Sequence, residues 1–284
     1  MAGLREVGAK QPDRRGTVAN GVIERIAEMI QDGDLSPGDR LPPELELAGQ
    51  LGVSRTSLRE AVRALTLVNV LHVRQGDGTY VASLEPTALL ASTRFVVSLI
   101  QGAALLELFA VRRTLESWAA AEAAARIDDD RLRQLRGYLT TMKSASSIDD
   151  VTTADAAFHA LVAETAGNGF LAALLDSLSG QTRRVRLARY GMDARTRQNT
   201  IMEHEEIYRA LALRDPELAR TVAAFHVSRG ETWLAQLDSN DGHGPDPALS
   251  EAVLQPQPDS SAVVDGLNSA MQSARNGKDK RPRR

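Results

Sequence analysis

The sequence contains no cysteine, few aromatic residues and no long apolar run. The absence of cysteine excludes a disulfide framework and thiol chemistry, and it is consistent with a reducing cytosol. No apolar stretch approaches the roughly 18 residues of a membrane span, and the N-terminus lacks the apolar core of a signal peptide. We therefore expect a cytoplasmic protein that does not contact membranes. Aromatic residues make up only 4% of the chain, and their scarcity favours helices over sheets.

The chain also has no large excess of charge of either sign. Its 34 Lys and Arg residues stand against 37 Asp and Glu residues, which gives a formal net charge of −3. A globally basic nucleic-acid coat is therefore excluded, and any contact with DNA must come from a local basic patch. With roughly 150 residues per domain as a guide, a chain of 284 residues is long enough for two domains.

A local basic patch occurs in the helical segment that follows Gly52. Ser54 is a good N-cap for this segment. Its apolar residues recur at the spacing of one buried helix face: Leu58, Ala61, Val62 and Leu65. The opposite face is polar and carries Arg55, Thr56, Arg59 and Arg63. Guanidinium and hydroxyl groups near a helix N-terminus suit contacts with phosphates and guanine edges, and a solvated charged face is the alternative.

The surroundings of this helix favour DNA binding over the solvated face. Apolar periodicity predicts helices over residues 17–31 and 44–50, so the basic helix is the second helix of a helix-turn-helix. Residues 70–81 then alternate between apolar and polar side chains and turn at residues 76–78, which predicts a two-stranded wing. Glycine at the tip of a wing, here Gly76, allows the backbone to approach DNA closely.

Residues 17–82 resemble the winged helix of GntR-type bacterial transcription regulators, through the stretch SPGDRLPPELELAGQLGVSRTSLREAVRALTLVNVLHVRQGDGTYVA. The resemblance implies DNA contacts for the start of the basic helix and for the wing tip, at Ser54, Arg55, Thr56, Arg59 and Gly76. The chain departs from the usual Leu-Pro-Ser-Glu-Arg-Glu-Leu motif at Pro43 and Leu45. Because Leu45 replaces an arginine that reaches DNA in relatives, the operator affinity or sequence is expected to differ.

Beyond a polar linker at residues 83–87, helical periodicity continues almost without interruption to residue 237. The predicted helices cover residues 87–100, 105–126, 129–144, 149–166, 168–189, 195–213 and 216–237. Their lengths indicate an antiparallel all-α bundle over residues 88–237. The polar arm of residues 1–16 and the polar tail of residues 238–284 are expected to be flexible. The expected fold is mainly α, with an N-terminal winged helix-turn-helix over residues 17–82 and this C-terminal bundle.

Three of the five histidines lie on the apolar-striped helices of the bundle: His159, His204 and His226. Asp155 precedes His159 by four residues, so both side chains project from the same helix face. Three imidazoles and a carboxylate suit a first-row divalent ion such as zinc. The alternative for each histidine is an ordinary core or half-exposed residue, and periodicity alone does not bring the four side chains together.

Three segments around these residues resemble the metal-binding segments of the FCD effector domain of FadR-type GntR regulators: Asp155-Ala-Ala-Phe-His159, Glu203-His-Glu-Glu-Ile207 and Ala224-Phe-His-Val227. The resemblance, which covers residues 88–237, implies a divalent metal ion at the centre of the bundle, with zinc expected first and nickel or manganese as alternatives. It also implies that the carboxylate of a small organic acid completes the coordination. Phe158 is interpreted as a core residue and Glu203 as a surface residue.

The organic acid requires a further partner, for which Arg112 is the first candidate. This residue falls on an apolar helix face, and a buried guanidinium without an anion is costly. Pairing with a core glutamate is the alternative, whereas the resemblance makes Arg112 the residue that clamps the ligand. Asn199, five residues before His204, is a second candidate for ligand contact. The basic row from Arg183 to Arg189 is interpreted as a solvated or salt-bridged helix face.

Together these features predict a ligand-responsive transcription regulator. We expect a homodimer that places two recognition helices in successive major grooves of a pseudo-palindromic operator. A small carboxylate would shift the protein between two arrangements of its winged helices, and repression relieved by ligand is the default. The alternatives are a purely structural metal site, an apolar acyl effector bound without metal, and a metal-dependent enzyme. No general base at a recognisable spacing is present, so an enzyme is not expected.

Overall fold

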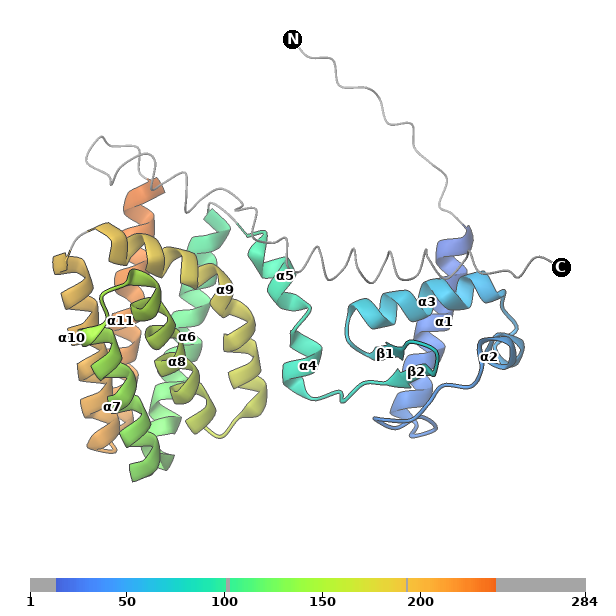
Figure 1. The fold of residues 1–284 in the computed structure, drawn as a ribbon, viewed down its shortest axis with the longest axis horizontal. Coiled ribbons are helices and arrows are strands. Elements are labelled where there is room, and N and C mark those ends of the chain that lie inside the picture. Colours follow the sequence, from blue (N-terminus) through green and yellow to red (C-terminus); the bar gives the residue numbers. More distant parts are fainter. Residues whose placement is uncertain (1–13, 101–102, 193, 239–284) are drawn as a thin grey trace, which may run out of the picture. The chain divides into compact units, whose positions relative to one another are not determined.

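The computed structural model describes residues 14–100, 103–192 and 194–238, and the chain divides into two compact units, residues 1–92 and 93–284 (Figure 1). Each unit has a hydrophobic core of its own. The predicted arm of residues 1–16 and tail of residues 238–284 lie outside the described residues, apart from the start of the first helix and the end of the last.

The N-terminal unit contains the predicted winged helix-turn-helix. Its elements follow in the order α1 (Arg14–Gln31), α2 (Glu44–Gln50), α3 (Arg55–Leu67), β1 (Leu71–Arg74), β2 (Gly78–Val81) and α4 (Pro86–Leu90). The two strands form an antiparallel hairpin in which Leu71 lies opposite Val81. Apolar residues from α1, α2, α3 and both strands make the core of this unit: Ile26, Leu47, Leu58, Leu71 and Val81.

The start of α3 is fixed by the turn that precedes it. Gly52 has a φ of +66°, a left-handed conformation that glycine adopts without strain. The hydroxyl of Ser54 then accepts a hydrogen bond of 3.1 Å from the backbone amide of Ser57, as predicted for an N-cap. Because α3 begins at this point, Leu58 and Ala61 face the core and the basic side chains face solvent.

The C-terminal unit is an all-α bundle, as predicted. Its helices are α5 (Thr93–Ser98), α6 (Ala103–Arg126), α7 (Asp129–Ser144), α8 (Ile148–Thr165), α9 (Gly169–Met192), α10 (Ala194–Ala212) and α11 (Pro216–Asp238). α6 packs along α11, and α8 packs against α7 and α9 (Figure 1). None of the helices in the described part of the chain is long and apolar enough to cross a membrane.

Polar side chains set the starts of the bundle helices, and large apolar side chains fill the space between them. The carboxylate of Asp128 accepts a hydrogen bond from the Arg131 amide at the start of α7, and Asp215 accepts one from the Leu218 amide at the start of α11. The interior is filled by Leu135, Met142, Phe158, Ile207 and Leu211. Phe158 is fully buried, which confirms its interpretation as a core residue.

The stretch of residues 87–100 differs from the prediction of one helix, because it forms two helices, α4 and α5. The hydroxyl of Ser92 donates to the Leu89 carbonyl, which satisfies this acceptor locally where α4 ends. The buried side-chain amide of Gln181, on α9, donates to two carbonyls at the end of α5: Val97 at 3.0 Å and Ile100 at 3.1 Å. The prediction was wrong at residues 91–92, where the chain breaks between α4 and α5, because apolar periodicity does not register a local polar contact such as that of Ser92.

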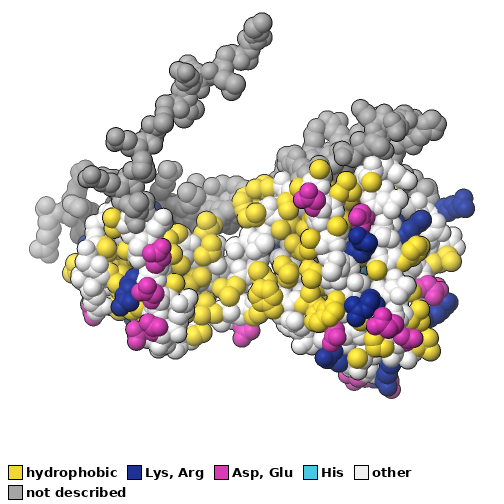
Figure 2. Space-filling view, turned by 180° about the vertical axis from the view of Figure 1, so that it is seen from behind, with side chains coloured by type: hydrophobic (Ala, Val, Ile, Leu, Met, Phe, Trp, Pro, Cys, Tyr) yellow, Lys and Arg dark blue, Asp and Glu magenta, His cyan; other side chains and the backbone are white. Residues whose placement is uncertain are grey.

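The surface of the C-terminal unit mixes charges of both signs. On the face that Figure 2 shows, basic side chains lie among acidic and apolar ones rather than forming a broad basic area. Several exposed arginines of the bundle are paired with carboxylates, as Arg113 is with Glu231 at 3.2 Å. The bundle surface therefore lacks, among the described residues of that face, the concentrated positive charge that DNA binding requires.

Candidate metal centre

The four predicted metal ligands meet inside the bundle. Asp155 and His159 come from successive turns of α8, His204 from α10 and His226 from α11. One ligand atom of each residue lies within 4.8 Å of the ligand atoms of the others. Asp155, His204 and His226 are buried, and the side chain of His159 is only 14% exposed. The cluster is therefore shielded from bulk water.

The shortest distances in the cluster join the carboxylate of Asp155 and the Nε2 atoms of two histidines. Asp155 Oδ1 lies 2.9 Å from His204 Nε2 and 4.0 Å from His159 Nε2, and these two nitrogen atoms are 3.2 Å apart. The ring centre of His226 lies 4.4 Å from that of His204 and 5.1 Å from that of His159. The carboxylate and the three imidazoles thus converge.

Each histidine is oriented by an acceptor at its other ring nitrogen. His159 Nδ1 lies 2.9 Å from Glu116 Oε2, His204 Nδ1 lies 2.7 Å from the Thr200 carbonyl oxygen, and His226 Nδ1 lies 2.9 Å from Glu203 Oε2. An acceptor at Nδ1 holds the ring proton there and leaves the Nε2 lone pair for a metal ion. All three imidazoles are therefore held in the tautomer that a metal site requires.

The donor set fits a divalent cation. With the ring protons at Nδ1, the Nε2 atoms of His159 and His204 present lone pairs to each other and to the Asp155 carboxylate, an arrangement that a cation would stabilise. Burial lowers the pKa of His159 and, reinforced by His204, lowers the pKa of His226 to about 3, so both are neutral near pH 7, as metal binding requires. Three imidazoles and one carboxylate are ligands that zinc, nickel and manganese accept.

Two neighbours fix the orientation of the Asp155 carboxylate. Tyr190 donates its hydroxyl proton to Asp155 Oδ1 at 2.8 Å, and the guanidinium of Arg186 lies 2.5 Å from Oδ2. Burial opposes the charge of this carboxylate, but the guanidinium of Arg186 outweighs it and holds the pKa of Asp155 well below its usual range. Asp155 is therefore an anion at neutral pH and is available as a metal ligand.

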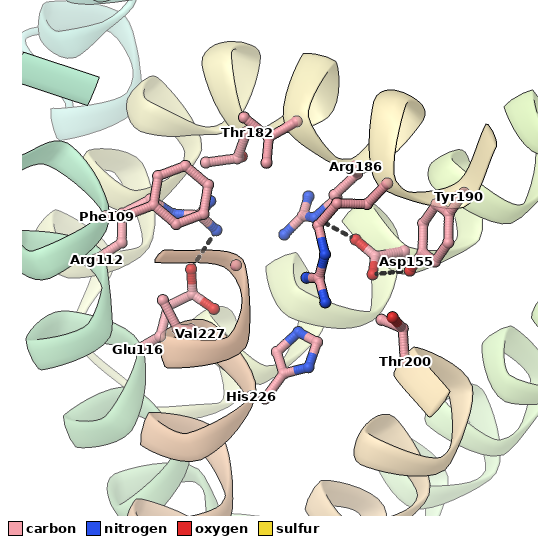
Figure 3. A pocket seen from close by; sticks show the side chains of 13 residues that line it. Phe109, Arg112, Glu116, Asp155, Thr182, Arg186, Tyr190, Thr200, His226 and Val227 are labelled. Atoms are coloured by element: carbon pink, nitrogen blue, oxygen red, sulfur yellow. Dashed lines mark hydrogen bonds and ion pairs between the residues drawn. The ribbon is translucent and has the colours of Figure 1, made fainter. Parts of the chain in front are cut away.

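A pocket lies beside the cluster, between α6, α9, α10 and α11 (Figure 3). Its wall combines charged and apolar side chains, including Phe109, Arg112, Glu116, Arg186, Arg189 and His226. Figure 3 shows Arg112 with Glu116 on one side of this space and Arg186 with Asp155 on the other, with His226 pointing toward it from below. A molecule in the pocket would meet two of the four candidate metal ligands, Asp155 and His226, together with several guanidinium groups.

Glu116 connects the pocket to the metal ligands. Its Oε1 atom accepts a hydrogen bond from Nη2 of Arg112, and its Oε2 atom faces His159. Although burial raises the pKa of this carboxyl, Arg112 and His159 lower it below the ordinary value of a glutamate. The core glutamate that could pair with Arg112 is therefore present, and the pair lines the pocket.

Two buried guanidinium nitrogens in the pocket wall have no hydrogen-bond partner among the described residues: Nε of Arg112 and Nε of Arg189. Burial lowers the pKa of both arginines, which is the expected response of a cation removed from water. Buried donors without acceptors are rare in folded proteins and usually indicate a missing partner. These two donors belong to opposite helices, α6 and α9.

The structure corrects two site expectations and adds residues that the sequence did not indicate. Glu203 is not a surface residue, because its side chain is 11% exposed and its carboxylate bonds His226. Asn199 is exposed and lies outside the pocket wall, which its neighbour Thr200 joins instead. Arg186 and Arg189 belong to the row interpreted as a solvated or salt-bridged helix face. Arg186 is indeed paired with a carboxylate, that of Asp155, and both arginines line the pocket.

Some of these missed residues carried a weak sequence signal. Glu116 follows Arg112 by four residues, the spacing of an ion pair along one helix, so the pair could have been inferred. Glu203 gave no such signal because its partner His226 belongs to another helix. Tyr190 likewise meets Asp155 only through the packing of α9 against α8.

The polar residues of α3 form the exposed face that the sequence predicted. Arg55, Thr56, Arg59 and Arg63 are all exposed, as is the capping residue Ser54. Glu44, at the start of α2, accepts hydrogen bonds from Arg59, whose Nε and Nη2 atoms both lie 2.8 Å from Glu44 Oε2. This contact holds one edge of the guanidinium, while the Arg59 side chain remains 48% exposed. Leu45, which replaces the usual arginine, is 73% exposed.

Gly76 lies at the exposed tip of the wing with a φ of +78°. The hairpin below it is braced by Tyr80, whose hydroxyl donates to Asp77 Oδ2 at 2.6 Å and whose ring lies 4.3 Å from the guanidinium carbon of Arg74. The backbone at Gly76 is free of side-chain bulk and can approach a phosphate or a groove closely.

Comparison with known proteins gives two family matches. Residues 18–81 match the family described as "Bacterial regulatory proteins, gntR family", and residues 107–229 match the FCD domain. The first covers the helix-turn-helix and wing, and the second covers all four residues of the metal cluster.

Individual relatives agree with these matches. The chain is 31% identical over 208 residues to the uncharacterized HTH-type transcriptional regulator YcbG of Bacillus subtilis, covering 71% of this chain and 83% of that protein. It is 29% identical to the HTH-type transcriptional regulator LutR of Bacillus subtilis, covering 73% and 96%, and 28% identical to the Exu regulon transcriptional regulator of Escherichia coli, covering 76% and 84%. Among solved structures, Streptococcus agalactiae GntR matches with a TM-score of 0.52 and 28% identity, covering 75% of this chain and 99% of that one.

Proposed function

The chain belongs to the gntR family of bacterial regulatory proteins and carries an FCD domain, and from this premise we propose that it is a repressor that responds to a small organic acid through a metal-centred pocket. Its relatives are transcription regulators, and the chain is a DNA-binding transcription regulator rather than an enzyme. Under the proposal, the acid lowers the affinity of the protein for its operator.

The observation that carries this proposal is the convergence of Asp155, His159, His204 and His226 beside a pocket that contains arginine. These four residues would hold the metal ion, with zinc expected first and nickel or manganese as alternatives. A divalent ion held there would offer a Lewis-acidic position to a carboxylate oxygen. The acceptors at each Nδ1 atom orient the imidazoles for this role before any ion binds.

Arg112 is proposed to clamp the carboxylate of the effector. Its guanidinium is buried in the pocket wall, and its Nη2 atom is held by Glu116. The Nε–H group has no acceptor among the residues that the structure describes, so an anion in the pocket would satisfy it. Asn199 is not retained as an effector contact because it lies outside the pocket wall.

DNA contact is proposed for the exposed face of α3 and for the wing tip, at Ser54, Arg55, Thr56, Arg59, Arg63 and Gly76. Glu44 holds the guanidinium of Arg59 at one edge. The N–H groups of this guanidinium that do not bond Glu44 would contact a guanine edge or a phosphate. We further propose a homodimer that places two copies of α3 in successive major grooves. Residues 17–82 would then bind DNA, residues 83–87 would link the domains and residues 88–237 would bind the effector.

The first test is the metal content of the full chain, purified without a histidine tag and measured by elemental mass spectrometry. We expect one zinc, nickel or manganese ion per chain, and loss of that ion in the Asp155→Ala/His226→Ala variant. Asp150→Ala, which removes an exposed carboxylate from the same helix, is the matched control and should retain the ion. No metal in the unmodified chain, even after reloading, would contradict the metal-centred pocket.

A second measurement separates a sensing role from a purely structural one. Metal-stripped protein that keeps its DNA affinity but no longer responds to small carboxylates supports the proposal. Metal-stripped protein that unfolds, and whose reloaded form binds no carboxylate, would assign the ion to stability alone.

A further inference from the structure

The charged groups of the pocket do not balance one another. Three arginines line it, at positions 112, 186 and 189, but only two carboxylates do, those of Glu116 and Asp155. Each carboxylate already has partners within the protein. Glu116 holds Arg112 and His159, and Asp155 holds Arg186 and His204.

Arg189 is the guanidinium that remains. Its Nε atom is buried and has no hydrogen-bond partner among the described residues. Glu203, the carboxylate whose charge acts most strongly on Arg189, is bonded to His226 instead. The facing position on α11 is Gly230, where an added Cβ would lie 3.6 Å from Arg189 Nη1 and 2.9 Å from the Phe109 ring. Because glycine occupies this position, the Phe109 ring and the Arg189 guanidinium both approach the backbone of α11 closely.

A metal ion increases the imbalance. Three guanidiniums and one divalent ion carry five positive charges, and Glu116, Asp155 and the more distant Glu203 together carry three negative charges. Arg229, which also pairs with Glu203, is left out of this count because its side chain is half exposed to water. Two positive charges would therefore remain in a largely buried site. Buried charges without counter-charges are strongly unfavourable, so a bound molecule with two negative charges suits the site better than one with a single charge.

The geometry points to a small dicarboxylate as the effector, an inference that rests on the proposed function. One carboxylate would meet the metal ligands and Arg112, and the second would meet Arg189. Figure 3 shows the pocket as a space between α6 on one side and α9 on the other, with Arg112 and Arg186 projecting into it from these two sides. A monocarboxylate satisfies the first position and leaves Arg189 without an anion.

The test is isothermal titration calorimetry of the metal-loaded full chain with matched pairs of acids: succinate against butyrate, and malate against 2-hydroxybutyrate. Each pair has the same number of carbon atoms and differs in the second carboxylate. Because a hydrogen bond to a charged group contributes about 1.5–3 kcal/mol, we expect at least one dicarboxylate to bind about tenfold or more tightly than its monocarboxylate partner.

The variant Arg189→Gln tests whether Arg189 is the residue that binds the second carboxylate. It should reduce the preference for the dicarboxylate to about twofold or less, while the affinity for the monocarboxylate stays within about threefold of the unmodified value. Arg183→Gln is the matched control, because Arg183 lies on the same helix but is exposed and paired with Asp149. This control should keep the full preference.

The outcomes separate this inference from the proposed function. Equal binding of both members of each pair, or a preference that survives Arg189→Gln, overturns the dicarboxylate inference and leaves a carboxylate-sensing regulator. If neither kind of acid binds the metal-loaded chain, the proposed function fails, and the inference that rests on it fails as well.

Discussion

Glu116 contacts both the proposed effector clamp and a proposed metal ligand. One of its oxygens bonds Arg112, and the other faces His159. Carboxylates that orient metal-binding histidines commonly change metal affinity by about 10- to 100-fold when they are removed. We expect Glu116→Gln to weaken metal binding by a factor in this range, because the amide keeps the shape of the side chain but loses its charge.

Competition against a chelator of known affinity measures this effect. Glu122→Gln, on the same helix but paired with Arg126 outside the cluster, should leave metal affinity unchanged. Unchanged affinity in Glu116→Gln would mean that His159 does not need its carboxylate partner.

The sequence indicated the four candidate ligands but not the residues that orient them. Asp155 and His159 share one helix, and their four-residue spacing follows from helix geometry alone. The contacts of Glu203 with His226, and of Tyr190 with Asp155, each join two helices. No periodicity along a single chain segment reports such contacts, so Glu203 was assigned to the surface.

At the scale of elements, α9 links the pocket to the beginning of the bundle. It carries Arg186 and Arg189 in the pocket wall, and its buried Gln181 donates two hydrogen bonds to the end of α5. A displacement of α9 on ligand binding would therefore be transmitted to α5, the first helix of this unit.

We expect Gln181→Leu to reduce the response of DNA binding to the effector while metal content stays at the unmodified level. It should also lower the free energy of unfolding by about 1–3 kcal/mol, because the two carbonyls at the end of α5 lose the hydrogen bonds that Gln181 donates. Fluorescence anisotropy of labelled DNA, with and without the acid, measures the response, and thermal unfolding measures the stability.

Gln134→Leu, at an exposed position of α7, is the control for this variant. A full response in Gln181→Leu would show that α5 is not on the route from the pocket.

Most helix positions were predictable because caps and breaks are encoded locally. Asp128 and Asp215 cap the helices that follow them, and the predicted starts of α7 and α11 agree with the structure. The exception is the stretch of residues 87–100, which breaks at residues 91–92 between α4 and α5. Apolar periodicity continues across this break, so it predicted a single helix.

At the scale of the whole molecule, the two units are expected to have separable tasks. Arg59→Ala should lower affinity for an operator, selected from random DNA with the unmodified chain, by about tenfold, because a guanidinium that contacts a guanine edge contributes about 1–3 kcal/mol. The same variant should keep its metal. Asp155→Ala should bind this DNA nearly normally, but the acid should no longer release it.

Fluorescence anisotropy with the selected DNA and with random DNA distinguishes these effects. Equal loss of DNA affinity in both variants would contradict the separation of tasks. A loss in Arg59→Ala that is the same for selected and random DNA would assign Arg59 to phosphate contact rather than to base recognition.

The contacts of Glu116 link the response of the protein to the acid with the amount of metal available in the cell. One of its oxygens holds the arginine proposed to clamp the acid, and the other holds a histidine proposed to bind the metal. Because the acid is also proposed to coordinate the metal, the two ligands would bind cooperatively, and thermodynamic reciprocity requires that each changes the affinity for the other by the same factor. The regulator would then act as a coincidence detector: in a cell starved of the metal, it would remain on its operator however abundant the acid became.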